Sequence, residues 1–339
     1  MNELPAIVSH LLSAEPQEGN VLATLVTVEG SSYRQPGARL LLTAEGVRIG
    51  SISGGCLEED VWERSRAVRE TGQSETVVYD TTSENDLVWG VGLGCHGVVR
   101  LSIERLPPRP AWAAVVAENL RHRRATTLAV VWQASDPATL GTRLSGAEKE
   151  SEGVFREVIR PPPHLAIFGA GDDAQPLLRF AKEIGWRVTI ADPRPAFATQ
   201  LRFSAADDVL CAPAAELPSR ADLRPGDMAI VMTHHYVHDL PILGHLLIGC
   251  PLNYLGLLGP KKRSERILQD IAKSGVIITP ALKAQLRAPA GLDLGGDTPA
   301  EVALSILAEM RATLAGRDAR PLKERVRPIH DPLNRLPLL

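Results

Sequence analysis

Short apolar runs alternate with helical patterns through the second half of the chain. Residues 164–168 form one apolar run, a glycine-rich loop follows, and a helical pattern of apolar positions then ends at Gly185. The next run, residues 186–192, ends in an acidic residue. Further runs lie at residues 209–211, 228–232, 253–258 and 276–278. Such alternation of strands and helices predicts a Rossmann-like, doubly wound parallel α/β sheet.

The last helix of this half has a recognisable beginning. Thr298, Pro299 and Glu301 supply an N-cap residue, a proline at the first helical position and the acid of a capping box. We expect an apolar face made of Val302, Leu304, Ile306, Leu307 and Met310.

The first half of the chain has a β-rich pattern. We expect strands at residues 21–28, 38–43, 77–79 and 98–103, with an amphipathic helix at residues 57–71. This pattern predicts an N-terminal α/β domain with a mixed sheet.

A weak internal repeat connects two parts of the first half. Five residues recur at a constant spacing, so that Val26, Ser31, Gly37, Arg39 and Leu40 correspond to Val130, Ser135, Gly141, Arg143 and Leu144. The repeat favours an edge unit at residues 110–160 within the first domain. Two similar hairpins that arose by chance are the alternative.

Three consecutive prolines, Pro161, Pro162 and Pro163, separate the halves. They cannot continue a helix or a central strand, and they form a stiff connector. The length of 339 residues suits two domains of roughly 150 residues each. We therefore expect one domain at residues 1–160 and a second at residues 161–339.

Composition excludes several classes of function. A net charge of −3 and an aromatic content of 4% are unlike those of a nucleic-acid-binding protein. The four cysteines contain no CxxC pair, so neither a zinc ribbon nor a disulfide scaffold is expected. The sequence shows no signal-peptide pattern and no apolar run of about 18 residues. We expect a cytoplasmic protein that does not contact membranes.

The loop after the run at residues 164–168 resembles a dinucleotide-binding turn. Gly169 suits the tight turn, Gly171 suits close approach of a pyrophosphate, and Ala174 suits packing of the helix on the strand. Asp192 ends the following strand, where a ribose-binding acid belongs. The two acids between Gly171 and Ala174 would repel a pyrophosphate. The loop therefore either binds NAD(P) or is capped by its own acids.

Two glycine-rich segments of the first half carry thiols. Ser53, Gly54, Gly55 and Cys56 precede the expected helix at residues 57–71, and their backbone N–H groups can form an anion-binding concavity. A buried cysteine that fills space in a tight turn is the alternative.

The second thiol segment contains Cys95 beside His96. Together with Cys56 these residues could converge on one pocket. Since a zinc site needs three or four converging ligands, we expect no metal site of the protein's own here, and instead sulfur chemistry or a soft ligand for the thiol or metal of a cofactor.

Basic residues and a histidine supply further candidates. Arg34 and Arg39 flank a turn, and guanidinium groups prefer bidentate contact with phosphate or carboxylate. A hydrated hairpin loop is the alternative. His234 follows an expected strand at the carboxyl end of the parallel sheet, where ligands bind. We discount a metal-binding pair of His234 and His238, because this segment is expected to be a loop.

Two more segments follow in the second half. Residues 260–266 put four basic residues at an expected helix start, which suits an anionic ligand or a solvated face. Arg287 precedes the last glycine-rich segment, residues 291–296.

Taken together, these motifs resemble the XdhC/CoxI family. In the first half the resemblance is carried by residues 29–39 (EGSSYRQPGAR), 50–58 (GSISGGCLE) and 92–95 (GLGC). In the second half it is carried by residues 168–171 (FGAG), 192–194 (DPR), 232–234 (MTH), 254–259 (YLGLLG) and 288–295 (APAGLDLG). His96 stands where the family pattern has a glycine, and residues 260–263 replace a Ser-Arg-Arg-Lys-like run.

The resemblance implies an accessory factor for molybdenum hydroxylases such as xanthine dehydrogenase. Such a protein would bind the molybdenum cofactor (molybdopterin), hold it during sulfuration and pass it to the apoenzyme. Its partners would include a sulfur donor such as a cysteine desulfurase, and it would form a homodimer. We therefore expect a maturation chaperone more than an enzyme, with a cofactor or sulfur site at Ser53, Gly54, Gly55, Cys56, Cys95, Arg34 and Arg39. The alternative is an NAD(P)-dependent oxidoreductase that uses Gly169, Gly171, Ala174, Asp192 and His234.

Overall fold

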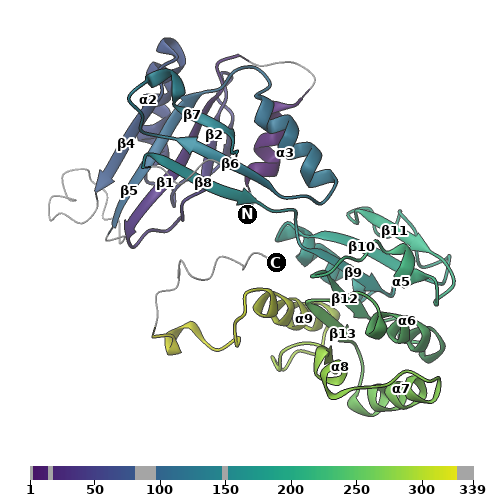
Figure 1. Ribbon diagram of the computed structural model, residues 1–339. Coiled ribbons are helices and arrows are strands. Elements are labelled where there is room, and N and C mark those ends of the chain that lie inside the picture. The colour runs from purple at the N-terminus through teal and green to yellow at the C-terminus, as the bar shows by residue number, and fades with distance from the viewer. Residues whose placement is uncertain (1–2, 14–17, 81–96, 147–151, 327–339) are drawn as a thin grey trace. The chain divides into compact units, whose positions relative to one another are not determined.

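The chain folds into two compact units that meet in sequence between Pro161 and Pro162 (Figure 1). The computed structural model describes residues 3–13, 18–80, 97–146 and 152–326. Each unit has its own apolar core.

The N-terminal unit is built on a five-stranded antiparallel sheet. The strand order is β3-β2-β1-β5-β4, and the strands are β1 (Val21–Gly30), β2 (Arg39–Leu42), β3 (Arg48–Gly50), β4 (Glu75–Asp80) and β5 (Gly97–Arg105). The α/β class that we expected for both units is confirmed, with one refinement. The N-terminal sheet that we expected to be mixed pairs its described strands antiparallel.

A three-stranded antiparallel sheet belongs to the same unit. Its order is β7-β6-β8, and its strands are β6 (Thr126–Val131), β7 (Gly141–Leu144) and β8 (Val154–Ile159). The two segments connected by the internal repeat thus form two antiparallel pairs, β1 with β2 and β6 with β7.

Helices and the second sheet cover the two faces of the five-stranded sheet. On one face α2 (Glu58–Thr71) packs against Leu40 and Leu42, while Leu41 joins the core of α1 (Glu3–Leu11), α3 (Ala111–Arg121) and the three-stranded sheet. This split follows from the period of two along a strand.

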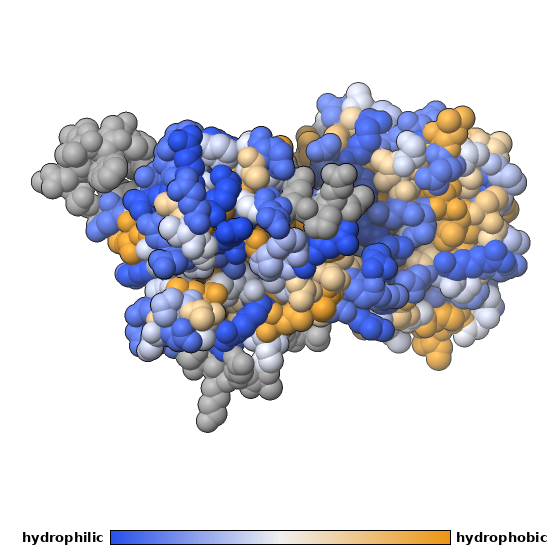
Figure 2. Space-filling model, turned by 90° about the horizontal axis from the view of Figure 1, so that it is seen from above, coloured by the Kyte–Doolittle hydropathy of each residue, from blue (hydrophilic) through white to orange (hydrophobic). Residues whose placement is uncertain are grey.

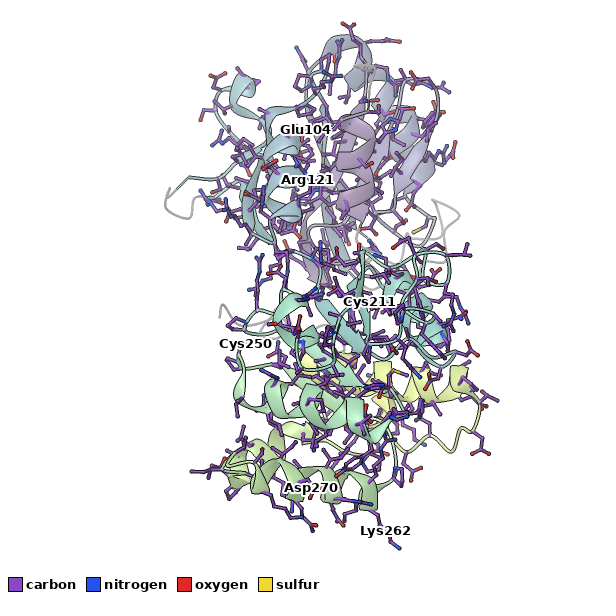
Figure 3. The ribbon with its side chains drawn as sticks, turned by 90° about the vertical axis from the view of Figure 1, so that its right-hand side faces the viewer. Glu104, Arg121, Cys211, Cys250, Lys262 and Asp270 are labelled. Atoms are coloured by element: carbon purple, nitrogen blue, oxygen red, sulfur yellow. The ribbon has the colours of Figure 1, made fainter. Side chains whose placement is uncertain are left out.

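Polar side chains connect the two N-terminal sheets. Arg39 Nη1 of β2 donates to Glu157 Oε2 of β8 at 2.8 Å. Glu104 of β5 (Figure 3) accepts a hydrogen bond from the Thr142 backbone N–H of β7 at 2.9 Å. Burial raises the pKa of Glu104, although the backbone N–H and the hydroxyl of Thr142 both donate hydrogen bonds to its carboxylate. The buried faces of the two sheets are therefore joined by specific polar contacts.

The C-terminal unit contains the expected parallel sheet. Six strands pair in parallel in the order β11-β10-β9-β12-β13-β14. They are β9 (His164–Phe168), β10 (Arg187–Asp192), β11 (Asp208–Cys211), β12 (Met228–Val231), β13 (Tyr254–Leu257) and β14 (Leu286–Arg287). Since the chain runs outward from β9 in both directions, the order reverses between β9 and β12, which is the topological switch point of a doubly wound sheet.

Helices cover both faces of this sheet (Figure 1). One face packs against α4 (Ala174–Glu183) and α9 (Pro299–Leu314), the other against α5 (Leu217–Arg220), α6 (Tyr236–Ile248) and α7 (Lys261–Lys273). The short helix α8 (Pro280–Gln285) precedes β14. The described residues also contain two 3-10 turns, Pro137–Thr139 and Leu322–Glu324.

Two details of the sequence analysis are wrong and one is confirmed. Residues 276–278 do not form a strand, because Thr279 caps α8 immediately afterwards, and β14 takes the place beside β13. Leu304 is exposed on α9, whereas Ala303, Ile306, Leu307 and Met310 are buried. The capping box of Thr298 and Glu301 is present.

None of the described helices is a candidate membrane span. Among the described residues, no helix is both long and apolar enough to cross a membrane. The face seen in Figure 2 mixes hydrophilic and hydrophobic residues.

Candidate functional site

A small pocket lies beside the start of α2 in the N-terminal unit. Its volume is about 190 Å³. It is lined by Ser31, Ser32, Tyr33, Ile52, Ser53, Gly54, Cys56, Leu57, Gly97 and Val99. The structure therefore brings three of the expected site residues, Ser53, Gly54 and Cys56, to the wall of one cavity.

The Ser53 hydroxyl organises the loop that precedes α2. Its oxygen accepts hydrogen bonds from the backbone N–H groups of Gly55, Cys56 and Leu57, each at 3.1 Å, and the hydroxyl donates to Glu58. Gly55 adopts φ +111°, a conformation that favours glycine. The N–H concavity expected to face an anion is thus filled by the loop's own hydroxyl.

Glu58 places a carboxylate beneath this loop. It accepts hydrogen bonds from Ser51 Oγ at 2.9 Å and from the Ser53 backbone N–H at 2.9 Å. Burial raises the pKa of Glu58, but the hydrogen bonds from Ser53 and Ser51 outweigh burial and leave the pKa below its usual value. The pocket wall therefore presents hydroxyl, backbone and thiol groups above a negative charge.

The thiol of Cys56 is half-buried and lines the pocket. Cys95 and His96, which we expected to converge with it, lie outside the described residues. Cys211 and Cys250 belong to the C-terminal unit, Cys211 at the end of β11 and Cys250 after α6 (Figure 3). Among the described thiols, Cys56 is the one that borders this pocket.

Arg34 and Arg39 contact other residues, and neither belongs to the described part of the wall of this pocket. The Arg34 guanidinium forms an ion pair with Glu3 of α1. Arg39 is buried, 2% exposed, and its side chain points toward the three-stranded sheet, because its neighbour Leu40 faces α2. The sequence showed the two arginines beside one turn but not the face of the sheet that each would occupy.

The glycine-rich loop after β9 is closed by Asp192. A Cβ on Gly169, at φ +135°, would lie 2.4 Å from the Met232 carbonyl oxygen, so the position requires glycine. The backbone N–H of Ala170 donates to Asp192 Oδ2 at 2.7 Å. Arg194 Nε and Nη2 also donate to this carboxylate, at 2.9 and 2.7 Å. The expected ribose-binding acid is therefore fully buried and engaged within the protein.

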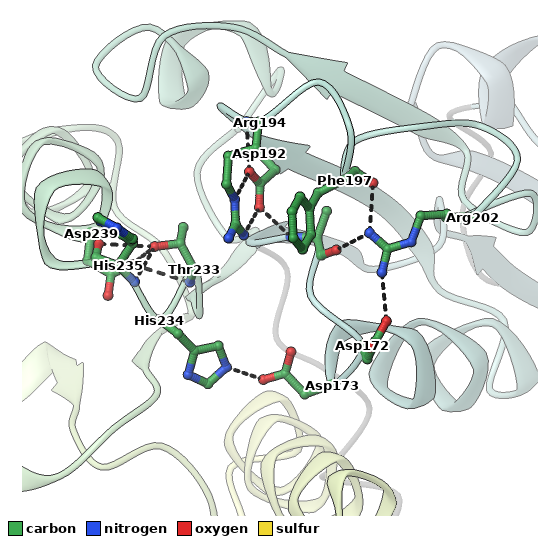
Figure 4. A network of polar contacts seen from close by, with 11 residues as sticks. Asp172, Asp173, Asp192, Arg194, Phe197, Arg202, Thr233, His234, His235 and Asp239 are labelled. Atoms are coloured by element: carbon green, nitrogen blue, oxygen red, sulfur yellow. Dashed lines mark hydrogen bonds and ion pairs between the residues drawn. The ribbon is translucent and has the colours of Figure 1, made fainter.

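The charge of Asp192 is stabilised by these partners. Burial raises the pKa of Asp192, but hydrogen bonds from Arg194 and Ala170 outweigh burial and lower it overall. The Arg194 guanidinium lies 4.0 Å from the centre of the Phe197 ring. The carboxylate, the guanidinium and the ring form one packed unit at the end of β10 (Figure 4).

The two acids of the same loop are also paired. Asp172 Oδ1 accepts from Arg202 Nη2 at 2.7 Å, and Asp173 pairs with His234 of the loop after β12 (Figure 4). The hydrogen bond between the His234 imidazole and the Asp173 carboxylate raises the pKa of His234. Since β9 and β12 flank the switch point, this ion pair crosses the position at which a doubly wound sheet usually binds its ligand.

His234 has an unusual backbone conformation. Its φ is +58°, in the left-handed region that few residues other than glycine adopt. Such conformations store strain and are concentrated at functional sites. His234 lies in the loop between β12 and α6, as expected, but the expectation of a loop is wrong for His238, which lies in the first turn of α6. In the part of the chain that the structure describes, no three His, Cys, Asp or Glu residues form a metal-binding group.

A second, more open pocket adjoins His234. It has a volume of about 510 Å³ and is lined by His234, Tyr236, Pro260, Lys262, Arg263 and Arg266. Asp239 is buried behind it and pairs with Arg263, while its Oδ1 accepts from Thr233 Oγ1 at 2.6 Å. The sequence pattern indicated residues 260–266 as a candidate site but did not show that Tyr236 and Asp239 lie beside them. The sequence could have indicated this proximity, because the two segments follow β12 and β13, which are neighbouring parallel strands.

Arg287 lies on β14, beside Gly256 of β13, and its side chain is exposed. Nearby, the Tyr254 hydroxyl donates to Glu309 Oε2 at 2.7 Å, and the same oxygen accepts from the Gly291 backbone N–H at 2.8 Å. Arg287 is therefore at the edge of the sheet, while Tyr254 and Glu309 tie the last glycine-rich segment to α9.

The chain is similar to known proteins along most of its length. Residues 13–80 match the XdhC and CoxI family, and residues 165–310 match the XdhC Rossmann domain. A protein of Bacillus subtilis (strain 168), named as a probable xanthine dehydrogenase subunit, is 34% identical over 321 residues, which cover 88% of this chain and 94% of that protein.

Two further similarities extend over both units. The molybdenum cofactor insertion chaperone PaoD of Escherichia coli (strain K12) is 26% identical over 293 residues, covering 86% of this chain and 83% of that protein. The crystal structure of a xanthine dehydrogenase from Bacillus halodurans matches with a TM-score of 0.80 and 31% identity, covering 96% of this chain and 99% of that one.

Proposed function

The chain belongs to the XdhC and CoxI family, and on that basis we propose that it is an accessory factor for a molybdenum hydroxylase of the xanthine dehydrogenase type. In this role it binds the molybdenum cofactor, assists its sulfuration and inserts it into the apoenzyme. The similarity to a protein named a molybdenum cofactor insertion chaperone supports the binding and insertion steps. We propose further that the protein acts as a cytoplasmic homodimer and that a donor such as a cysteine desulfurase supplies the sulfur.

The observation that carries this proposal is the pocket that Cys56 borders beside α2. A volume of about 190 Å³ is below the range of roughly 300–1,000 Å³ typical of sites that enclose a whole ligand of drug size. The pocket therefore suits one part of the cofactor. A thiol is a soft donor, which suits the metal and sulfur end rather than the phosphate.

The charge of the loop supports the same orientation. The N–H groups of Gly55 and Cys56 already donate hydrogen bonds to the Ser53 hydroxyl, and this hydroxyl donates to the Glu58 carboxylate beneath it. A phosphate would meet a negative charge and no free N–H concavity at this position. We therefore place the molybdenum and dithiolene end of the cofactor at Cys56, with Gly54 and Tyr33 as neighbouring wall.

The alternative function, an NAD(P)-dependent oxidoreductase, rests on the strand order of the C-terminal sheet. Three contacts count against it. The Ala170 N–H is bonded to Asp192, Arg194 covers the same carboxylate, and Asp173 lies at the switch point in an ion pair with His234. A dinucleotide would have to displace all three. Titration of the protein with NADH and NADPH, followed by fluorescence, tests this alternative, and saturable tight binding would revive it.

The proposal is tested by purifying the protein from cells that make the cofactor and measuring bound pterin and molybdenum. We expect both to co-purify in equal amounts, and we expect the loaded protein to activate a molybdenum hydroxylase apoenzyme. Pterin and molybdenum at background level at micromolar protein would refute the proposal.

A further inference from the structure

The open pocket beside His234 gathers positive charge at the carboxyl ends of two neighbouring parallel strands. It lies between the loop that follows β12 and the loop that follows β13, and its volume is about 510 Å³. We propose that this pocket binds the phosphate group of a small molecule, with Lys262 and Arg266 as the recognising cations. A volume of this size lies within the range of roughly 300–1,000 Å³ typical of small-molecule sites.

The cations of the pocket differ in what already neutralises them. Arg263 forms an ion pair with Asp239, whose side chain is completely buried, so its charge is balanced inside the protein. Among the described residues, neither Lys262 nor Arg266 forms an ion pair with a carboxylate. Arg266 instead lies 5.1 Å from the centre of the Tyr236 ring. The charge of Lys262 is therefore available to an anion, whereas Arg266 also interacts with the Tyr236 side chain and with the nearby Asp270 carboxylate.

The helix that carries these residues adds to the positive potential. α7 begins at Lys261, Pro260 is its N-cap residue, and its first turn contains no acidic residue. Helix N-termini favour acidic side chains, because the helix dipole places a partial positive charge there. Lys262 in this first turn is unfavourable for the helix alone, and a bound anion would stabilise the helix terminus and both cations together.

The pocket adjoins the closed dinucleotide position, because His234 lines the pocket and also pairs with Asp173, but its other cations lie elsewhere. The ion pair of Asp173 and His234 blocks the switch point between β9 and β12, whereas Lys262 lies one strand further, after β13. On its wall, the Tyr236 ring is covered by Arg266, and the Tyr236 hydroxyl donates to Asp270. Recognition at this site therefore depends on charge, and guanidinium and ammonium groups are the usual partners of phosphate.

The shared chemistry of the ligand is a phosphate monoester, which both the molybdenum cofactor and an unrelated metabolite can supply. Figure 3 shows Lys262 on α7, with Asp270 further along the same helix. The anion site does not depend on the proposed function, because its cations would attract a phosphate whether or not the protein handles molybdenum.

The test is isothermal titration of the full-length protein at low ionic strength with inorganic phosphate, pyrophosphate and glucose 6-phosphate. We expect saturable binding of glucose 6-phosphate that weakens as salt is added. In the variant Lys262→Gln combined with Arg266→Gln, we expect affinity to fall by at least about tenfold. Lys261→Gln is the matched control, since Lys261 stands in the same helical turn but does not line the pocket.

Two outcomes would overturn the site. One is the absence of saturable binding at millimolar ligand, and the other is equal weakening in the double variant and in Lys261→Gln, which would indicate unspecific attraction. Melting temperatures of all variants show whether each one folds. A competition arm identifies the source of the phosphate: displacement of glucose 6-phosphate by the molybdenum cofactor assigns the pocket to the cofactor's phosphate, and its persistence assigns the pocket to another metabolite.

Discussion

Two glycine-rich loops, one in each unit, precede a helix, and the sequence made both of them candidates for binding an anion. In the loop at residues 53–56, the Ser53 hydroxyl accepts hydrogen bonds from the N–H groups that would face the anion. In the loop at residues 169–174, the carboxylate of Asp192 accepts the Ala170 N–H instead. Each loop therefore satisfies its backbone with a side chain of the protein, but one uses a neutral group and the other a charged group.

The two loops also differ in how firmly they are closed. The C-terminal loop is held by two ion pairs, Asp172 with Arg202 and Asp173 with His234, and by the hydrogen bond from the Ala170 N–H to Asp192. The N-terminal loop is held from within, by Ser53 and Glu58, and opens onto the pocket that Cys56 borders. A glycine-rich turn in a sequence thus indicates a helix start with special backbone geometry, and the nearby side chains decide whether a ligand can use it.

The largest effect is expected from opening the C-terminal loop. Asp192→Ala removes a fully buried carboxylate and leaves Arg194 and the Ala170 N–H without their acceptor. We expect the free energy of unfolding to fall by about 3 kcal/mol, measured by urea unfolding. Asp172→Ala is the control on the same loop, because Asp172 is 90% exposed and its ion pair should contribute less than about 1 kcal/mol. Equal losses in the two variants would contradict the distinction.

A smaller effect is expected in the N-terminal loop. Ser53→Ala removes the acceptor of three backbone N–H groups in the loop before α2, and we expect a cost similar to the loss of a helix cap, about 1–2 kcal/mol. Ser51→Ala serves as control, since the one hydroxyl proton of Ser51 lies between Glu58 and the Ser53 carbonyl oxygen as acceptors, and the hydroxyl accepts none of these N–H groups. If Ser51→Ala destabilised the protein more than Ser53→Ala in urea unfolding, the account of this loop would be wrong.

The smallest effect concerns the ion pair at the switch point. Its partner Asp173 raises the pKa of His234 in the folded state, so the stabilisation is complete below the unfolded value of 6.5 and is lost as pH rises through the folded value above it. The His234 side chain is 56% exposed, which limits the contribution to at most about 1 kcal/mol.

The measurement compares the wild-type protein with His234→Gln at about pH 5 and at about pH 9. Wild-type stability should exceed that of the variant by more at the acidic pH. A difference between the two proteins that stays constant across this range would show that the ion pair contributes nothing.

Much of the fold follows from local pattern. The apolar run at residues 164–168 became β9, the capping box of Thr298 and Glu301 began α9, and the alternation of strands and helices gave the parallel sheet. These features depend on the period of side chains along a strand or helix and on chemistry within a few residues. The error at residues 276–278 arose because an apolar run of three residues is too short to distinguish a strand from a buried connection.

The sites were harder to predict because they depend on pairing across long distances in the sequence. The spacing of Gly169, Gly171 and Asp192 was that of a dinucleotide site, yet the loop is closed by Asp192, which accepts the Ala170 N–H from 22 residues away. Its Asp173 is paired with His234, 61 residues away. Arg39 was expected at a ligand, but a one-residue step along β2 sends its side chain to the opposite face from Cys56 and toward Glu157. Neither outcome is encoded in a local pattern.

The central claim is that the loop at residues 53–56 holds the cofactor while the loop at residues 169–174 is closed. The most direct test measures pterin and molybdenum bound per protein in Cys56→Ser and in Cys250→Ser, whose half-buried thiol lies in the C-terminal unit. We predict that Cys56→Ser loses most of the bound cofactor at an unchanged melting temperature, while Cys250→Ser retains it. Full retention in Cys56→Ser, or a loss matched by an equal fall in melting temperature, would contradict the claim.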